Sequence, residues 1–169
     1  PPLFTKEIGT GRWLGIPFPI FVAIAATILV SFLVSSTSWG RYLYAIGGNT
    51  KAAYLSGISV GVYTASVYIL CSVLTAIAGI LLTARTSSGE PNLGPEYPLE
   101  SITAAVIGGI SLRGGEGRIL GAVLGALFIT ILTNGMNLIR IESYFQTIAI
   151  GVILILAVVV DRLKDRWRA

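Results

Sequence analysis

The side chains best suited to chemistry in this sequence are amides and hydroxyls rather than acids or imidazoles. The chain has no histidine and a single cysteine, Cys71, which excludes imidazole metal sites, Ser-His or Cys-His catalysis and an internal disulfide framework. Thr130, Asn134 and Asn137 recur at intervals of four and three residues, so a helix would place them on one face. Two interpretations stay open for this face: hydrogen bonding between helices, or the lining of a path along which a hydroxylated solute exchanges partners.

A glycine-rich stretch, SLRGGEGRILG at residues 111–121, is the segment that most resembles a phosphate-binding loop. It lacks the Gly-Lys-Ser/Thr ending that holds phosphate and magnesium, and Leu120 stands where the dinucleotide pattern needs its last glycine. We therefore expect no nucleotide site, cofactor or metal in this chain. Gly108 and Gly109, which precede the stretch, are further candidates for the solute path.

The composition indicates which solvent surrounds these residues. Hydrophobic residues make up 54% of the chain and charged residues 12%, about half of the ~25% charged fraction of soluble domains. A soluble domain of ~150 residues buries only about 70% of its unfolded surface, too little to hide so much apolar area from water. The formal charge of +4 comes mostly from basic residues beside apolar segments, which favours orientation in a lipid bilayer over binding of nucleic acid. We predict an all-α, polytopic membrane helix bundle that forms one transmembrane domain over residues 1–169.

Four apolar stretches have the length of membrane-spanning helices, about 20 residues, and contain no Asp, Glu, Lys or Arg. They are Phe18 to Thr37, Val62 to Ala84, Ile119 to Leu138 and Ser143 to Val160. A fifth segment, Tyr97 to Leu112, is shorter and begins among three prolines, Pro91, Pro95 and Pro98. We expect it to form a short or broken helix that neighbouring helices support, because unpaired backbone is not tolerated against lipid. The sequence therefore predicts about five transmembrane segments.

Small residues at four-residue intervals indicate close helix packing. Gly117, Gly121 and Gly125 recur in this way. Such spacing lets helix backbones approach one another in lipid, where no hydrophobic effect draws helices together. We interpret this stripe as a packing surface, with hinge points in a moving protein as the alternative.

The distribution of Lys and Arg constrains the topology. If all five segments cross, eight basic residues lie on one side and four on the other. If the short segment dips into the membrane and returns, the basic side gains one more residue, and on charge alone both topologies stay open. Both place the C-terminus in the cytoplasm. Because the chain begins Pro1-Pro2 without a methionine, we expect it to be a piece of a longer protein whose first half is missing.

A polar segment, GGNTKAAYLSGIS at residues 47–59, interrupts the apolar pattern. A short helix capped by Asn49 or Thr50 and ended at Gly57 would form a compact knob there. Within the segment, KAAYLSG fits the pattern Ala-Ala-x-x-x-Gly. This pattern resembles the loop of permeases in ATP-binding-cassette importers, usually written Glu-Ala-Ala-x-x-x-Gly, with Lys51 here in place of the acid.

The surrounding sequence strengthens the resemblance. The stretches GRYLYAIGGNTKAAYLSGI, LTAIAGILLTARTSSGEPNLG, LESITAAVIGGISLRGGEGRILGAVLGAL and NGMNLI resemble ribose-type sugar permeases in the same order. The resemblance runs from about Gly40 to Asp161. It implies a bacterial inner-membrane permease subunit of about ten spans, of which this chain is the C-terminal half, carrying a neutral sugar of the pentose or hexose type.

The family also implies partners and residue roles. A second permease copy would complete the pathway, a cytoplasmic ATP-binding subunit would hydrolyse ATP, and a periplasmic sugar-binding protein would deliver the solute, so this chain itself is expected not to be an enzyme. The coupling-loop residues carried over from the family are Gly47, Gly48, Asn49, Ala52, Ala53 and Gly57. The family places this loop, residues 38–61, in the cytoplasm, which favours the five-crossing topology and puts residues 85–98 in the periplasm.

Other functions remain open at this stage. A branched-chain amino acid permease shares the loop and the topology, although the lack of charged residues within the spans disfavours a zwitterionic solute. A passive solute channel would need no docking loop. A membrane enzyme would need a general base beside a nucleophile, and the sequence offers none within the spans.

Overall fold

The computed structural model describes residues 12–13, 16–86 and 94–168, and the chain divides into two compact units at about residue 91. The only strands among the described residues are β1 (Arg12–Trp13) and β2 (Ile16–Pro17), which form a two-residue antiparallel pair. Helices account for most of the rest, so the predicted all-α class is confirmed. Residues 87–93 of the predicted 85–98 loop lie outside the described residues.

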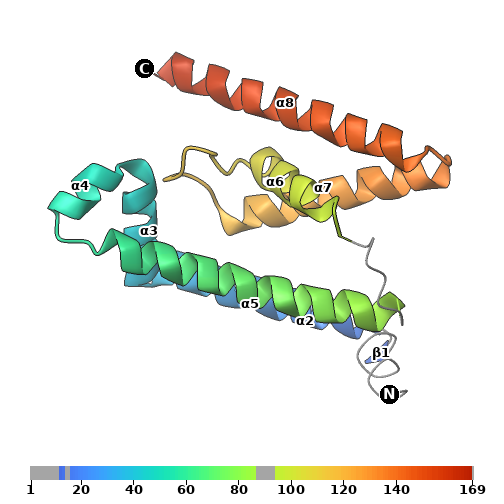
Figure 1. Cartoon of the computed structure of the whole chain (residues 1–169), viewed down its shortest axis with the longest axis horizontal. Helices are drawn as coiled ribbons and strands as arrows, with labels where there is room; N and C mark the ends of the chain where they lie inside the picture. Colours follow the sequence, from blue (N-terminus) through green and yellow to red (C-terminus); the bar gives the residue numbers. More distant parts are fainter. Residues whose placement is uncertain (1–11, 14–15, 87–93, 169) are drawn as a thin grey trace. The chain divides into compact units, whose positions relative to one another are not determined.

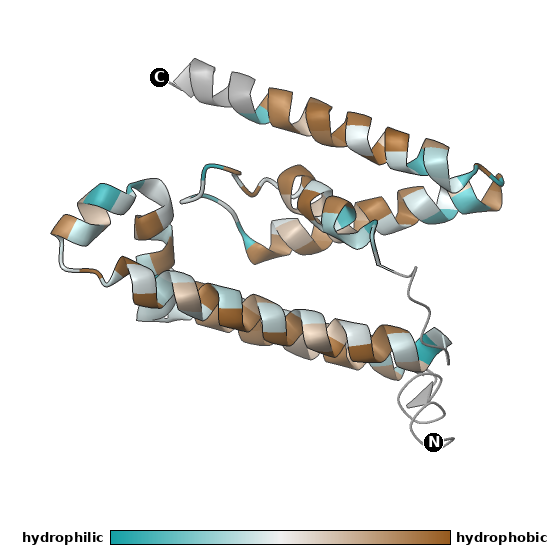
Figure 2. Ribbon diagram, in the orientation of Figure 1, coloured by the Kyte–Doolittle hydropathy of each residue, from teal (hydrophilic) through white to brown (hydrophobic). Residues whose placement is uncertain are grey.

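Within the part of the chain that the structure describes, four helices are long and apolar enough to cross a membrane, at the four positions that the sequence predicts. They are α2 (Phe18–Ser36), α5 (Val60–Thr86), α7 (Ile119–Leu138) and α8 (Ser143–Arg168). Figure 2 shows brown, hydrophobic residues along α5 and α7 and along the coloured part of α8. Many of their large apolar side chains are exposed, which is the arrangement expected where lipid or further protein covers the helices.

Two helix ends differ from the sequence prediction by more than two residues. Helix α8 continues past Val160 to Arg168, because hydropathy marks where a helix leaves the lipid and not where its hydrogen bonds stop. Helix α6 covers Tyr97–Ile107 and does not reach Leu112. At about 1.5 Å per residue, its 11 residues extend about 16 Å. The expected short helix is therefore confirmed, and it is shorter than the predicted segment.

Unit 1 is organised around a helix that the sequence prediction treats as loop. Residues 38–61 contain α3 (Ser38–Gly48) and α4 (Thr50–Leu55), and α3 contacts α2, α4 and α5. Extended backbone at Thr37 separates α2 from α3, and a Cβ added at Gly40 would overlap the carbonyl of Val34. This close approach requires glycine. Figure 1 shows α3 and α4 together at the end of unit 1 where α5 begins.

Unit 2 is built around the short helix α6, which packs against both α7 and α8 (Figure 1). Thr103, Ala104 and Val106 of α6 are buried, together with Ile129 of α7 and Ile150 of α8. The Thr103 hydroxyl donates a hydrogen bond to the carbonyl of Leu99, which satisfies the one polar side chain that is buried among the described residues.

The predicted glycine stripe packs where α6 meets α7. A Cβ added at Gly121 would overlap the carbonyl of Gly108, and one added at Gly125 would overlap the carbonyl of Ala104. Gly117 lies before the first residue of α7 and packs against Ile110 instead. The packing prediction is therefore confirmed for two of the three glycines, and their lack of side chains is what allows the helices to approach.

Helices α4, α6 and α7 end in the same Schellman motif. The residue after the C-cap has a positive φ in each: 82° at Gly57, 81° at Gly109 and 57° at Arg140. Its N–H donates to the carbonyl three residues earlier, and the next N–H donates to the carbonyl five residues earlier. Glycine adopts this conformation freely, whereas arginine adopts it at a cost.

Candidate functional site

The polar segment between α3 and α5 begins with a side-chain cap on α4. Asn49 has extended backbone (φ −154°, ψ 96°), and its Oδ1 accepts a hydrogen bond from the Ala52 N–H at 2.9 Å. The Asn49 N–H donates in turn to the carbonyl of Ala45, so one residue both ends α3 and starts α4. Thr50 points its hydroxyl back to the carbonyl of Ile46. The predicted cap is confirmed, and of the two candidates Asn49 provides it.

The two glycines that precede the cap belong to α3. Gly47 and Gly48 form the last residues of that helix rather than a loop, and Gly48 has open space where a Cβ would be. Glycine weakens a helix interior but is tolerated at its end, so this pair suits the point where α3 stops. The turn from α3 to α4 then needs only Asn49.

The end of α4 depends on backbone conformation rather than on space. Gly57 has a φ of 82°, and a Cβ added there would meet no atom within 4 Å. The Gly57 N–H donates to the carbonyl of Tyr54, and the Ile58 N–H donates to the carbonyl of Ala53. The glycine of the Ala-Ala-x-x-x-Gly pattern is thus explained physically, because it allows α4 to end abruptly.

The side chains of α4 divide into an inner and an outer set. Ala53 is buried, with 5% of its surface exposed, whereas Ala52 is exposed. Tyr54 and Leu55 are 70% and 78% exposed, although they lie outside the four long apolar helices. The coupling-loop residues that the family resemblance implies include Ala52 and Ala53 but not this pair. A tyrosine and a leucine in an otherwise polar segment were the signal that could have revealed it.

The chemistry available on α4 is that of a contact surface. Lys51 and Thr50 are exposed beside Tyr54 and Leu55, so an apolar patch has a polar edge. Among the residues that the structure describes, no three His, Cys, Asp or Glu side chains form a group that could hold a metal ion. A small exposed knob of this kind can bind a groove on another protein.

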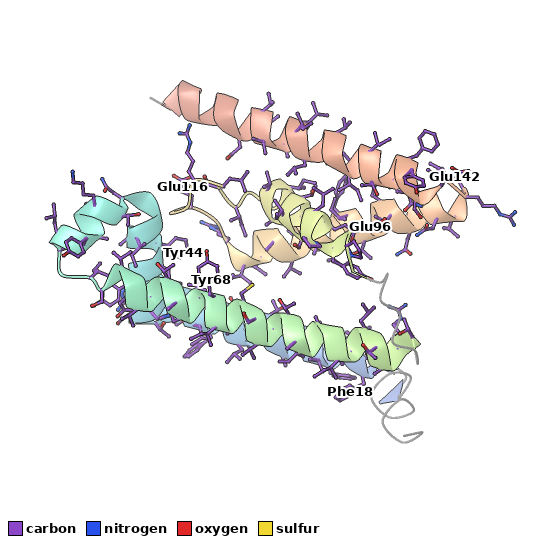
Figure 3. The ribbon with its side chains drawn as sticks, in the orientation of Figure 1. Phe18, Tyr44, Tyr68, Glu96, Glu116 and Glu142 are labelled. Carbon is purple, nitrogen blue, oxygen red and sulfur yellow. The ribbon has the colours of Figure 1, made fainter. Side chains whose placement is uncertain are left out.

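The acidic residues of unit 2 that Figure 3 labels lie away from the interiors of the long helices. Glu96 precedes α6, Glu116 lies between α6 and α7, and Glu142 lies in the turn before α8. This placement agrees with apolar helices that leave their charges at the membrane surfaces.

The second predicted group, on α7, has mixed roles. The Thr130 hydroxyl donates to the carbonyl of Ala126 at 2.8 Å, within its own helix. The Asn137 Oδ1 accepts a hydrogen bond from Gln146 Nε2 at 2.8 Å and so joins α7 to α8. Asn134 is exposed. Asn137 therefore has the interhelical role that sequence analysis left open, while the Asn134 amide remains available on the surface of α7.

The structure does not bring Gly108 together with this polar face. Gly108 packs against Gly121. At 3.6 residues per turn, Gly121 and Asn134 are separated by a rotation of about 140° around α7, so they occupy roughly opposite faces. Gly109 lies next to Gly108 as the positive-φ residue that ends α6. The predicted path residues thus form two separate groups, one in a helix contact and one on an open face.

Comparison with protein families identifies the kind of protein to which this geometry belongs. Residues 3–158 match the family described as branched-chain amino acid transport system / permease component. No match was found among solved structures. The family match covers both units and all four long helices up to residue 158, which together indicate a multi-pass membrane protein.

Individual relatives are permeases for sugars. The chain is 45% identical to the ribose import permease protein RbsC of Escherichia coli (strain K12) over 157 residues, which is 93% of this chain and 49% of the relative. It is 48% identical to the xylose transport system permease protein XylH of Haemophilus influenzae over 147 residues, 87% of this chain and 39% of the relative. It is 40% identical to the L-arabinose transport system permease protein AraH of Escherichia coli (strain K12), over 94% of this chain and 48% of the relative. The chain therefore spans about half the length of the relatives it matches.

Proposed function

Because this chain belongs to the family described as branched-chain amino acid transport system / permease component, we propose that it is about half of a permease subunit in an ATP-driven importer. The importer carries a neutral sugar, of the pentose or hexose type, across the bacterial inner membrane. The observation that carries the proposal is the capped helix α4 with its exposed Tyr54 and Leu55, in a chain 40–48% identical to pentose permeases. The chain supplies the transport path, and ATP hydrolysis takes place on a partner.

A sugar is favoured over an amino acid as the solute, despite the family's description. The names of the relatives specify ribose, xylose and L-arabinose. A zwitterionic solute would need charged or strongly dipolar groups at membrane depth, and α2 and α7 contain no Asp, Glu, Lys or Arg. Hydroxyl groups of a sugar can instead exchange hydrogen bonds with neutral amides such as that of Asn134.

Helix α4 is the proposed docking element for the ATP-binding subunit. Its apolar pair, Tyr54 and Leu55, would fill a groove on the partner, with Lys51 at the polar edge. Aromatic side chains that are buried at the centre of an interface commonly contribute most of the binding energy. The rigid ends of α4, set by Asn49 and Gly57, would let it transmit the partner's motion without unfolding.

In the proposed topology, α4 lies in the cytoplasm and the chain crosses the membrane five times. Helix α6 is too short to cross alone, and its contacts with both α7 and α8 supply the protein surroundings that a short helix needs at membrane depth. Residues 85–98 then face the periplasm, and the basic end of α8 faces the cytoplasm. A second permease copy and a periplasmic sugar-binding protein complete the proposed assembly.

The proposed solute path includes the face of α7 that carries Thr130, Asn134 and Asn137. Asn134 is the side chain on this face best placed to contact a solute, because the Asn137 amide oxygen is already bonded to Gln146. Gly108 and Gly109 would serve the path by fixing how α6 ends beside α7 rather than by contacting the solute.

Uptake in proteoliposomes tests the proposal. The full-length permease would be reconstituted with its ATP-binding subunit and binding protein, and accumulation of radiolabelled ribose, xylose, L-arabinose and leucine would be measured with and without enclosed ATP. We expect accumulation of at least one pentose that depends on ATP, and none of leucine. Accumulation of leucine alone would contradict the sugar assignment, and pentose flux that is unaffected by ATP would indicate a passive channel.

A further inference from the structure

Helices α3 and α5 are joined by two contacts beside the proposed docking helix. The indole Nε1–H of Trp39 in α3 donates a hydrogen bond to the Ser66 hydroxyl of α5 at 2.8 Å. The rings of Tyr42 in α3 and Tyr63 in α5 meet edge to face, with centroids 5.1 Å apart and an interplanar angle of 64°. We call these four residues the aromatic clamp.

The aromatic clamp has a regular geometry. Its two residues on each helix are three positions apart and therefore share one face. The later residue of α3 pairs with the earlier residue of α5, so the two helices run antiparallel at this point. The Ser66 hydroxyl donates to the carbonyl of Tyr63 at 2.7 Å, which fixes its orientation and leaves a lone pair for the Trp39 indole.

The clamp completes a closed ring of connections between α3, α4 and α5. One residue, Asn49, joins α3 to α4, and residues 56–59 join α4 to α5. Helix α4 contacts both neighbours, with Ala53 buried. Because α3 is also bonded directly to α5, a displacement of α4 would be expected to move α3 and α5 together instead of bending the short connections.

We propose that Trp39 and Ser66 are positioning residues that transmit movement of α4 to the long helix α5, and so set how many ATP molecules are hydrolysed for each solute transported. The inference rests on the proposed function. A purely structural hydrogen bond would affect the amount of folded permease, but it would leave this ratio unchanged in the molecules that do fold. The ratio therefore separates a positioning role from a packing role.

The test uses the full-length permease, reconstituted with its ATP-binding subunit and binding protein. Trp39→Phe keeps an aromatic ring and removes the donor, and Ser66→Ala removes the acceptor. An interhelical hydrogen bond in a membrane contributes about threefold to the equilibrium between coupled and uncoupled arrangements of α3 and α5. Each change should therefore raise the number of ATP molecules hydrolysed per sugar by about threefold. The double variant should hydrolyse no more ATP per sugar than the more affected single variant, because both changes remove the same hydrogen bond.

Ser72→Ala is the matched control, since the Ser72 hydroxyl donates to the Tyr68 carbonyl within α5 and lies outside the aromatic clamp. It should leave the ratio unchanged. Equal ratios for Trp39→Phe, Ser66→Ala and the unaltered protein would overturn the inference, as would a matching rise in Ser72→Ala. The amount of assembled complex, measured by size-exclusion chromatography, should stay constant; a loss of complex with no change in the ratio would also overturn it. Lack of ATP-driven uptake by the unaltered permease would instead refute the proposed function.

Discussion

Gly108 and Gly121 contact each other through their backbones, with no side chain between these two residues. A Cβ added to either residue would overlap the carbonyl of the other. The adjacent contact of Gly125 with the Ala104 carbonyl extends this surface by one turn of α7. The contact helps to hold an 11-residue helix among longer ones, because direct backbone approach adds to the packing of its buried side chains.

Gly121→Ala should destabilise the protein because its methyl group has no space against Gly108. Overpacking of this kind costs about 1–3 kcal/mol of the free energy of unfolding. Gly135→Ala is a matched control on the same helix, since a Cβ at Gly135 meets no atom within 4 Å. Denaturant titration of the purified permease should show a lower free energy of unfolding for Gly121→Ala and an unchanged value for Gly135→Ala. Equal stability of both variants would contradict the observed contact.

Gly57→Val should loosen the end of α4. A β-branched residue at a φ of 82° costs about 1–2 kcal/mol, so hydrogen exchange at the Ile58 amide should accelerate by roughly 5- to 30-fold. Gly57→Asn should be milder, because asparagine tolerates positive φ. Gly48→Val, one helix earlier and without positive φ, should leave exchange at Ile58 unchanged. An equal effect of Val and Asn at position 57 would show that φ is not the cause.

Arg140→Gly should stabilise the turn between α7 and α8. Arg140 has a φ of 57°, which costs an L-residue about 1–2 kcal/mol, while glycine adds up to about 1 kcal/mol of unfolded-state entropy. The expected gain in the free energy of unfolding is therefore about 0.5–1 kcal/mol. Arg140→Ala removes the charge without relieving the backbone and should give no gain. If the alanine variant were stabilised as much as the glycine variant, charge rather than conformation would be responsible.

Asn134→Leu and Asn137→Leu should have different effects. Loss of a solute contact at Asn134 should raise the KM for uptake about two- to tenfold, with stability unchanged. Asn137→Leu breaks the bond to Gln146 and should lower the free energy of unfolding by about 0.6 kcal/mol, with KM unchanged. Transport kinetics and denaturant titration of the two variants test this assignment. A KM effect confined to Asn137→Leu would reverse it.

The sequence predicted the elements whose signals are local. Uninterrupted apolar runs located all four long helices, and the pair Asn49 and Gly57 located both ends of α4. Both signals act through the nearest neighbours in the chain: side-chain hydropathy in one case, and a cap or a positive φ in the other. Tertiary packing was not needed to interpret them.

The features that the sequence did not predict depend on contacts between distant segments. Helix α3 was assigned to a loop because glycines and polar residues weaken its apolar pattern, and its contacts with α2, α4 and α5 support it. Burial of Ala53 and exposure of Leu55 could not be predicted from a pattern that treats the motif's alanines alike. The hydrogen bond of Trp39 with Ser66 joins residues 27 positions apart.

Cross-linking from position 55 tests most directly the claim that α4 docks on the ATP-binding subunit. A Leu55→Cys variant would be prepared in full-length permease without other cysteines, which requires Cys71→Ala in this chain. In membranes that contain the assembled transporter, we expect a short bifunctional thiol-to-amine reagent to join the introduced thiol to the ATP-binding subunit. We expect Leu138→Cys, at a similarly exposed position on α7, to give no such product. The account would be contradicted if a maleimide that cannot cross the inner membrane labelled position 55 in intact cells, or if only the variant at position 138 were cross-linked.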